Sequence, residues 1–165
     1  MSLASSRWKP SVTVAALIEH DGQFLLVEEH TPEGLRLNNP AGHLEIGESP
    51  QEAVMREVLE ETTCAFEPQA IVGVYLSRFL RRARGEDVTY LRICYAGRVS
   101  APDPALKLDE GIVRTLWMTA DEIRRDVARH RSPMVQRSLD DYLEGKRLPL
   151  DAVAGDASLK MPIER

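Results

Sequence analysis

The chain has 165 residues, of which 43% are hydrophobic and 28% are charged, and its formal net charge is -5. This length suits one domain with a substantial core. The acidic balance argues against a nucleic-acid polymer as a partner, because binding a phosphate backbone requires a basic surface. No apolar run approaches the roughly 18 residues of a membrane-spanning helix. Cys64 and Cys94 form neither a C-x-x-C pair nor a disulfide framework, which fits a reducing, cytoplasmic setting. No membrane contact is expected.

The first part of the chain predicts a β-hairpin followed by a loop. Residues 11–18 and 23–28 are rich in aliphatic side chains, and the turn His20-Asp21-Gly22 joins them. Residues 31–39 combine proline, glycine and paired asparagines, and are predicted to form a loop.

The clearest element is a helix from Pro50 to about Thr62. Ser49 stands at the N-cap position, and Glu52 completes an S-x-x-E capping box. Proline at the first helical position fits the same start, because its missing N–H has no partner there in any case.

The second half of the chain predicts three strands and two helices. The strands are expected at residues 70–79, 88–99 and 112–118, and the helices at residues 119–125 and 133–145. Strands on both sides of a capped helix indicate a mixed sheet with helices packed on it. The tail from residue 148 onward has weak patterning and is expected to be partly disordered.

Three carboxylates share one face of the helix over residues 50–62. At 100° per residue, Glu57, Glu60 and Glu61 fall within an arc of roughly 100° around Ala53. They repel one another by roughly 0.2–0.5 kcal/mol per pair, and Arg56 relieves only part of this repulsion. A bound Mg²⁺ or Mn²⁺ would reverse it, because hard cations prefer oxygen ligands, and the small Ala53 would leave room for the ion. A solvated acidic face is the alternative. The opposite side of the helix carries Val54, Met55, Val58 and Leu59.

The residues upstream favour the metal site. The stretch over residues 42–64 reads GHLEIGESPQEAVMREVLEETTC and resembles the Nudix box, G-x5-E-x7-R-E-U-x-E-E-x-G-U, where U is a bulky apolar residue. Six fixed positions match: Gly42, Glu48, Arg56, Glu57, Glu60 and Glu61. Thr63 replaces the second glycine of the box. Glycine commonly supplies a left-handed C-cap there, and a β-branched residue tolerates that conformation poorly, so the helix exit is expected to differ locally.

The resemblance extends over roughly residues 8–140, to a bacterial Nudix subgroup whose members act as phosphatases on nucleoside tri- and diphosphates and on hydroxymethylpyrimidine pyrophosphate. The segments that carry it are Trp8-Lys9-Pro10, Pro40 to Glu45, Leu116-Trp117 and Arg131-Ser132-Pro133. It implies an α+β fold, an α/β/α sandwich with a mixed sheet between helices, over residues 8–147. Residues 1–7 and 148–165 would be terminal tails.

The resemblance also implies roles for the box residues. Glu57, Glu60 and Glu61 would bind Mg²⁺, with Mn²⁺ as a substitute, and the carbonyl of Gly42 would add a ligand. Glu48 would join the outer metal shell or pair with Arg56. Arg56 itself would orient Glu57. The general base is left open among Glu60, Glu61, Asp109 and Glu110.

The implied reaction is the attack of water on phosphorus in a phosphoanhydride, with the metal polarising the bridging phosphates. The expected partner is a small phosphorylated metabolite, and a homodimer is left open. Substrate contacts are expected from His43, Arg78, Arg81 and Arg82. For His43 the alternative is a loop residue with local hydrogen bonds, and for the arginines it is a solubilising surface or a dimer contact.

Two other functions compete with the hydrolase. A Nudix-like sensor would bind a nucleotide-derived ligand without cleaving it, but such domains usually lose acidic box positions that are all present in this chain. A Nudix-fold isomerase would need further cysteine and acidic signatures, which the sequence lacks. The intact box favours the enzyme.

Overall fold

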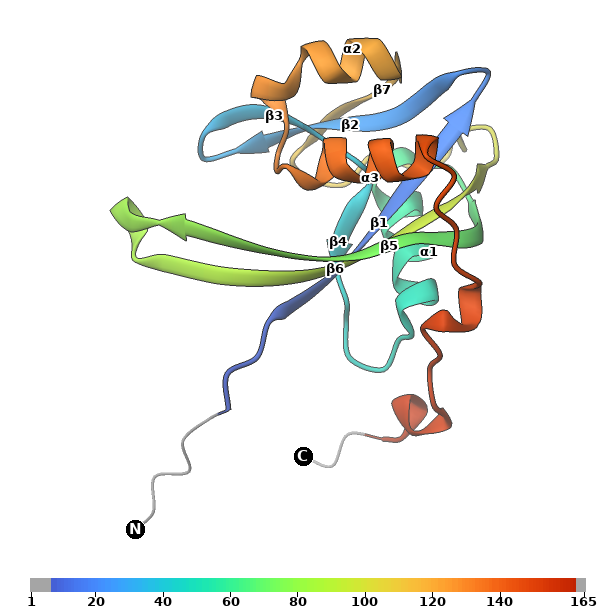
Figure 1. Cartoon of the computed structure of the whole chain (residues 1–165). Coiled ribbons are helices and arrows are strands. Elements are labelled where there is room, and N and C mark those ends of the chain that lie inside the picture. The colour runs from blue at the N-terminus through green and yellow to red at the C-terminus, as the bar shows by residue number, and fades with distance from the viewer. Residues whose placement is uncertain (1–6, 163–165) are drawn as a thin grey trace.

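The computed structural model describes residues 7–162, apart from the side chain of Ala83, and across that range seven strands form one mixed sheet (Figure 1). The strands are β1 (Ser11–His20), β2 (Gln23–Thr31), β3 (Gly34–Asn38), β4 (Ala41–His43), β5 (Phe66–Arg81), β6 (Glu86–Val99) and β7 (Ile112–Thr119). Their order is β3-β2-β1-β6-β5, with β4 beside β1 and β7 beside β2. The sheet is mixed because β1 runs parallel to β6 and antiparallel to β2 and β4.

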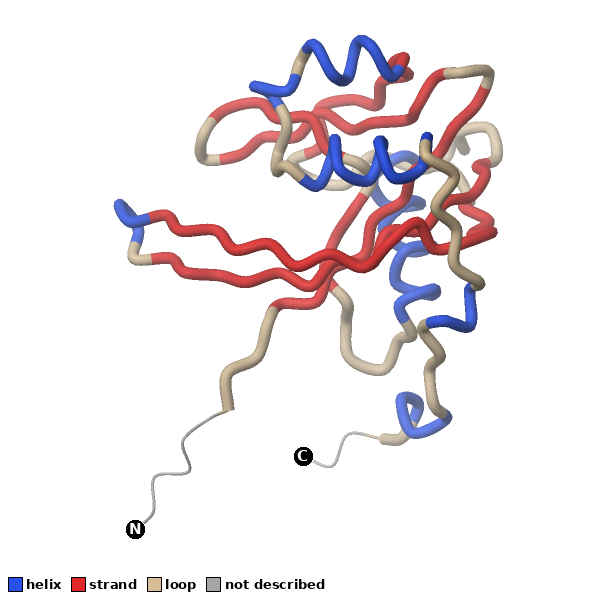
Figure 2. Tube along the Cα trace, in the orientation of Figure 1, coloured by secondary structure: helices blue, strands red, loops and turns tan. Residues whose placement is uncertain are grey.

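The helices cover both faces of this sheet (Figure 2). They are α1 (Pro50–Thr62), α2 (Ala120–Arg125) and α3 (Met134–Leu143), with short 3-10 turns η1 (Arg82–Arg84), η2 (Val127–Arg129), η3 (Leu150–Ala152) and η4 (Ala157–Lys160). Side chains alternate along β1 between the two faces, as in any strand. Val14 and Ile18 pack in one core cluster with α1, and Ala15 and Leu17 pack in the other with α2 and α3. The predicted α/β/α sandwich is therefore confirmed.

The start of α1 confirms the predicted capping box. The Glu52 N–H donates to Ser49 Oγ at 3.2 Å, and the Ser49 N–H donates to Glu52 Oε2 at 2.8 Å. The helix exit does not confirm the expected local difference. Thr63 adopts the left-handed conformation itself, with φ 60° and ψ 13°. Its N–H bonds the carbonyl of Leu59, and its carbonyl accepts from the N–H of Asp103, so hydrogen bonds on both sides hold the backbone that glycine would adopt.

The prediction of a loop over residues 31–39 is wrong. Gly34 to Asn38 form β3, which pairs antiparallel with β2 from Thr31↔Gly34 to Val27↔Asn38. Pro32 lies in the tight turn between β2 and β3, and Gly34, with φ 100°, is the first residue of β3. Leu37 is fully buried in the core, and its burial stabilises this short strand.

Both strands of the β5–β6 hairpin are longer than predicted. β5 extends from Phe66 to Arg81, and β6 begins at Glu86 and ends at Val99, as predicted. The far end of the hairpin extends away from the rest of the molecule (Figure 1). The His20-Asp21-Gly22 turn is confirmed between β1 and β2, with positive φ at Asp21 and Gly22, as a two-residue hairpin turn requires.

The tail beyond residue 147 is not a free extension. Leu148 and Ile71 exchange backbone hydrogen bonds of 2.7 and 2.9 Å. Lys160 then donates to Glu52 at 2.8 Å and to the carbonyl of Gly47 at 2.9 Å. The prediction of a partly disordered tail did not anticipate these contacts, because they join segments far apart in the sequence. The rest of the predicted tails, residues 1–6 and 163–165, lies outside the described residues. Within the described range, no helix is long and apolar enough to cross a membrane.

Candidate active site

The carboxylate face of α1 points into the protein. Glu57 and Glu61 are only 9% and 8% exposed, so a solvated acidic face is the wrong description of these two residues, whereas Glu60 is exposed. Ala53 is fully buried in the core cluster under α1, so it allows close packing of the helix and does not leave room for an ion. The apolar side is also narrower than predicted: Val54 and Val58 are buried, but Met55 and Leu59 are exposed.

Arg56 joins the box loop (residues 44–49) to α1. Its Nε and Nη2 donate to both carboxylate oxygens of Glu48, at 3.0 and 2.7 Å, and Nη2 also donates to the carbonyl of His43 at 3.0 Å. This two-pronged contact is a strong form of ion pair, and it holds the pKa of Glu48 below its usual range. Of the two roles open for Glu48, the structure shows the pairing with Arg56.

The same guanidinium contacts two of the three predicted metal ligands. Arg56 Nη1 donates to Glu57 Oε1 at 2.7 Å and to Glu60 Oε2 at 3.1 Å. The first contact matches the expected orientation of Glu57 by Arg56. The second relieves the repulsion along α1 through the spacing of four residues.

Gly42 on β4 makes room for the Glu57 carboxylate. A Cβ atom on this glycine would lie 2.0 Å from the carboxyl carbon of Glu57 and 2.1 Å from Oε1, far inside van der Waals contact. A side chain at this position would therefore force the end of the Glu57 side chain to move. Burial raises the pKa of Glu57, although Arg56 acts in the opposite direction.

Glu61 is the most perturbed carboxylate of the site. Its Oε2 accepts a hydrogen bond of 2.9 Å from the N–H of Ala41. Burial nevertheless raises the pKa of Glu61 to about 8, and the charges of Glu29, Glu57 and Asp109 add to this effect. A buried carboxylate among other acids is unfavourable as an anion unless a cation joins it.

The loop before β7 brings Asp109, one of the candidate general bases, close to Glu60 and Glu61. The N–H of Asp109 donates to the carbonyl of Glu60 at 2.9 Å, and the Asp109 charge acts on Glu61. Glu110 is exposed. The sequence did not point to Glu29, which lies on β2 and whose own pKa is raised by burial. The signal available was a charged pair, Glu28-Glu29, at the end of an aliphatic strand.

These residues fit a hard divalent cation. Carboxylate oxygens are its preferred ligands, and burial raises the pKa values of Glu57 and Glu61, so that a cation would stabilise their charged forms. Among the described residues, no three acidic, histidine or cysteine side chains converge on a single point. The positive group that Glu57 and Glu60 share is the Arg56 guanidinium.

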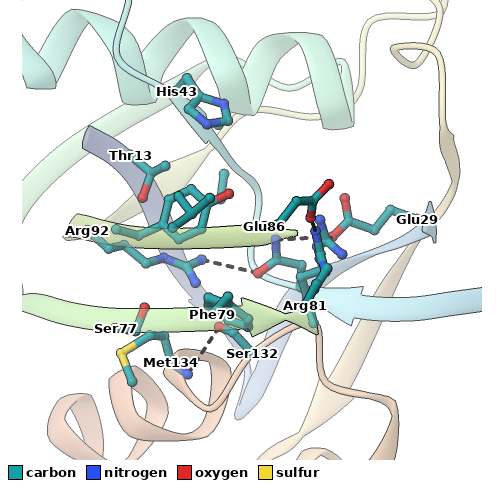
Figure 3. A pocket seen from close by; sticks show the side chains of 16 residues that line it. Thr13, Glu29, His43, Ser77, Phe79, Arg81, Glu86, Arg92, Ser132 and Met134 are labelled. Atoms are coloured by element: carbon teal, nitrogen blue, oxygen red, sulfur yellow. Dashed lines mark hydrogen bonds and ion pairs between the residues drawn. The ribbon is translucent and has the colours of Figure 1, made fainter. Parts of the chain in front are cut away.

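A cavity of about 530 Å³ lies beside Ala41 and Gly42, the residues that contact Glu61 and Glu57 (Figure 3). It lies between β4, the β5–β6 hairpin and the segment that leads into α3. Gly42 lines it on one side and touches Glu57 on the other. Other lining residues are Glu29, His43, Phe79, Tyr90 and Arg92. Arg92 was not among the predicted site residues, because its one signal is a charge inside the apolar run of β6.

The predicted substrate-binding residues are distributed unevenly around this cavity. His43 and Arg81 line it, and Arg81 is paired with Glu86 at 2.9 Å. Arg78 makes an exposed two-pronged pair with Asp87, and Arg82 is exposed in η1. Neither Arg78 nor Arg82 belongs to the cavity lining.

The sandwich, the box loop clamped to α1 and the buried carboxylates beside a cavity together define a protein of the Nudix fold class. The model of the NUDIX domain matches residues 7–138, and the chain belongs to the Nudix family. Phosphatase NudJ from Shigella boydii serotype 4 (strain Sb227) is 34% identical over 146 residues, covering 88% of this chain and 92% of that protein. Phosphatase NudJ from Escherichia coli (strain K12) gives the same values.

Solved structures agree with this assignment. A NUDIX hydrolase from Nitrosomonas europaea is 49% identical, covers 90% of this chain and 98% of its own, and has a TM-score of 0.81. A UDP-X diphosphatase is 18% identical, covers 85% of this chain and 64% of its own, and has a TM-score of 0.66; it shares the fold. The protein is therefore an enzyme, a Nudix hydrolase.

Proposed function

We propose that this hydrolase cleaves a phosphoanhydride bond in a nucleoside di- or triphosphate, or in a related small diphosphate such as hydroxymethylpyrimidine pyrophosphate. The observation that carries the proposal is the placement of two buried carboxylates, Glu57 and Glu61, against Gly42 and Ala41, two residues that line the cavity. The similarity to the NudJ phosphatases supports the same class of reaction.

The cation in this proposal is Mg²⁺, with Mn²⁺ as a substitute, held by Glu57, Glu60, Glu61 and the carbonyl of Gly42. A divalent cation offsets phosphate charge and makes a bound water more acidic. The negative field of these carboxylates would repel a polyphosphate in the absence of the cation, so substrate binding should depend on the metal as well as turnover.

The chain's own groups have three tasks in the proposed reaction. Arg56 keeps Glu57 in place through the 2.7 Å contact and fixes the box loop through Glu48. A carboxylate accepts the proton of the attacking water, and the placement of Asp109 beside Glu61 favours one of these two. His43 and Arg81 line the cavity, where they would contact the substrate.

A phosphate-release assay tests the proposal. The panel contains nucleoside di- and triphosphates, hydroxymethylpyrimidine pyrophosphate, ADP-ribose and dinucleoside polyphosphates, each with Mg²⁺ or with EDTA. Parallel reactions with added pyrophosphatase distinguish release of phosphate from release of pyrophosphate. Turnover of one class that requires the metal supports the proposal. Tight binding of a compound with no turnover of any would contradict it and indicate a sensor.

A further inference from the structure

Arg92 is a buried cation that faces the cavity and has no charged partner among the described residues. It lies in the middle of β6, between Thr13 on β1 and Tyr75 on β5, and it is 7% exposed. The cavity's other arginines are paired: Arg81 with Glu86, and Arg131 with Glu29 at 3.5 Å. Burial lowers the pKa of Arg92, while the charges of Glu29 and Glu61, which lie beyond ion-pair distance, act in the opposite direction.

One neutral contact orients the guanidinium. Arg92 Nη2 donates to Asn38 Oδ1 at 3.2 Å, and Asn38 Nδ2 donates to Glu29 Oε1 at 3.3 Å. A guanidinium has five N–H donors. Within the described part of the chain, the fully buried side-chain atoms without a partner are Tyr95 Oη and His130 Nδ1. The unused donors of Arg92 are therefore not sealed in the core, and they open on the cavity that this residue lines.

The walls around Arg92 suit a flat ring. Phe79 and Tyr90 meet edge to face with their centroids 5.8 Å apart, and His43 lies 6.1 Å from Tyr90. Figure 3 shows Arg92 among the side chains that line the cavity, together with His43 and Phe79. Aromatic walls favour a planar heterocycle, and the carboxylates of Glu86 and Glu29 on the same cavity are already paired with Arg81 and Arg131.

The position of Gly42 at the edge of the cavity indicates how a bound nucleotide would be oriented. Gly42 borders both the cavity and the Glu57 carboxylate. A nucleotide whose base lies beside Arg92 would extend its phosphate chain past Gly42 toward α1. This arrangement separates recognition of the base from the chemistry of the phosphates.

We propose that Arg92 binds the acceptor edge of the substrate's base and makes the enzyme prefer bases that carry a carbonyl oxygen next to a ring-nitrogen acceptor. The guanidinium fork matches the O6 and N7 atoms of guanine or hypoxanthine, whereas adenine offers an amino donor in place of O6. The inference rests on the proposed function, because it names the class of base within the same substrates.

The first test compares GTP, ITP and ATP as substrates with Mg²⁺. The wild-type enzyme should turn over GTP and ITP with a kcat/KM higher than that for ATP by roughly tenfold or more, the scale of one two-pronged base contact. Arg92→Met keeps a long side chain but removes the donors, and should abolish the preference. Arg92→Lys should also abolish it, because an ammonium lacks the fork. Arg98→Met, at the 70% exposed arginine further along β6, is the matched control and should keep the preference.

The second test measures binding without catalysis. Isothermal titration of the wild-type and the variants with GMP, IMP, AMP and inorganic phosphate separates the base from the phosphate. Stronger binding of GMP and IMP than of AMP, without any turnover, would keep this inference and contradict the proposed function. Equal binding of GMP and AMP by the wild-type enzyme would overturn the inference. A loss of inorganic phosphate binding in Arg92→Met would also overturn it, because Arg92 would then be a phosphate contact.

Thermal melting of each variant checks that it folds. If Arg92→Met does not fold, 7-deaza-GTP replaces it, since this analogue removes the N7 acceptor from the ligand and leaves the protein intact. A reduction of several-fold relative to GTP supports the inference, and an unchanged kcat/KM contradicts it.

Discussion

The carboxylate of Glu57 rests against the backbone of Gly42, where an added Cβ atom would lie 2.0 Å from the carboxyl carbon. The two residues are fifteen positions apart in the sequence and belong to different elements, β4 and α1. The absence of a side chain at Gly42 therefore lets the Glu57 carboxylate occupy its place at the proposed metal site.

We expect Gly42→Ala to push the Glu57 carboxylate away from this position. Displacing a metal-binding group costs roughly tenfold to a hundredfold in metal affinity or activity. The checks are kcat as a function of Mg²⁺ concentration and circular dichroism for the fold. A folded variant with the wild-type kcat and the wild-type Mg²⁺ requirement would show that the contact is dispensable.

Glu61→Gln should lower kcat by roughly a hundredfold or more, the loss typical for removing a charge-stabilising group from an active site. Glutamine keeps an oxygen that can accept from the Ala41 N–H, so the fold should remain intact. Steady-state kinetics with Mg²⁺ measure the effect, and Glu67→Gln on the exposed start of β5 is the control. Near-normal turnover by Glu61→Gln would contradict the metal assignment.

The raised pKa of Glu61 predicts that the metal-free protein becomes less stable as the pH rises. Burial, with the nearby acids, moves this pKa from 4.5 to about 8 in the folded chain. Between these values the folded state binds more protons than the unfolded state, so the free energy of unfolding falls with increasing pH. In EDTA, the Tm should therefore decrease from about pH 5 to about pH 8, and Glu61→Gln should weaken this trend. The same decrease in both proteins would assign it to other groups.

The left-handed Thr63 predicts that glycine is the more stabilising residue at the end of α1. Thr63→Gly and Thr63→Ala both remove the hydroxyl and the methyl group, but alanine keeps the Cβ atom that is strained at φ 60°. The glycine variant should be more stable than the alanine variant by about 1 kcal/mol, the cost of this conformation for a residue with a Cβ atom. Urea unfolding measures the difference. Equal stability of the two would mean that the backbone is not strained there.

The sequence predicts elements whose signals are local. The aliphatic runs of β1 and β2, their Asp21-Gly22 turn and the capping box of α1 each depend on neighbouring residues, and the structure confirms them. β3 was missed because the proline and glycine of a tight turn concealed the short strand that follows.

The residues of the site likewise fall into two groups, those that local spacing predicts and those that only the tertiary structure brings together. The box spacing identified Arg56 and the three glutamates, but one charged residue within a strand does not reveal which face it occupies. The positions of Glu29 and Arg92 at the site follow only from the pairing of the strands, which places Arg92 opposite Thr13 and Tyr75. The burial of Glu57 and Glu61 likewise depends on how α1 packs, which the helical period alone leaves open.

The bond between Lys160 and the box loop has a practical consequence for handling the protein. Lys160 donates hydrogen bonds to the carbonyl of Gly47 and to the Glu52 carboxylate. The segment around Lys160 therefore lies against the loop that carries Glu48. A purification tag attached close to Lys160 would crowd this loop, so kinetic work should use a protein with the tag placed away from this contact.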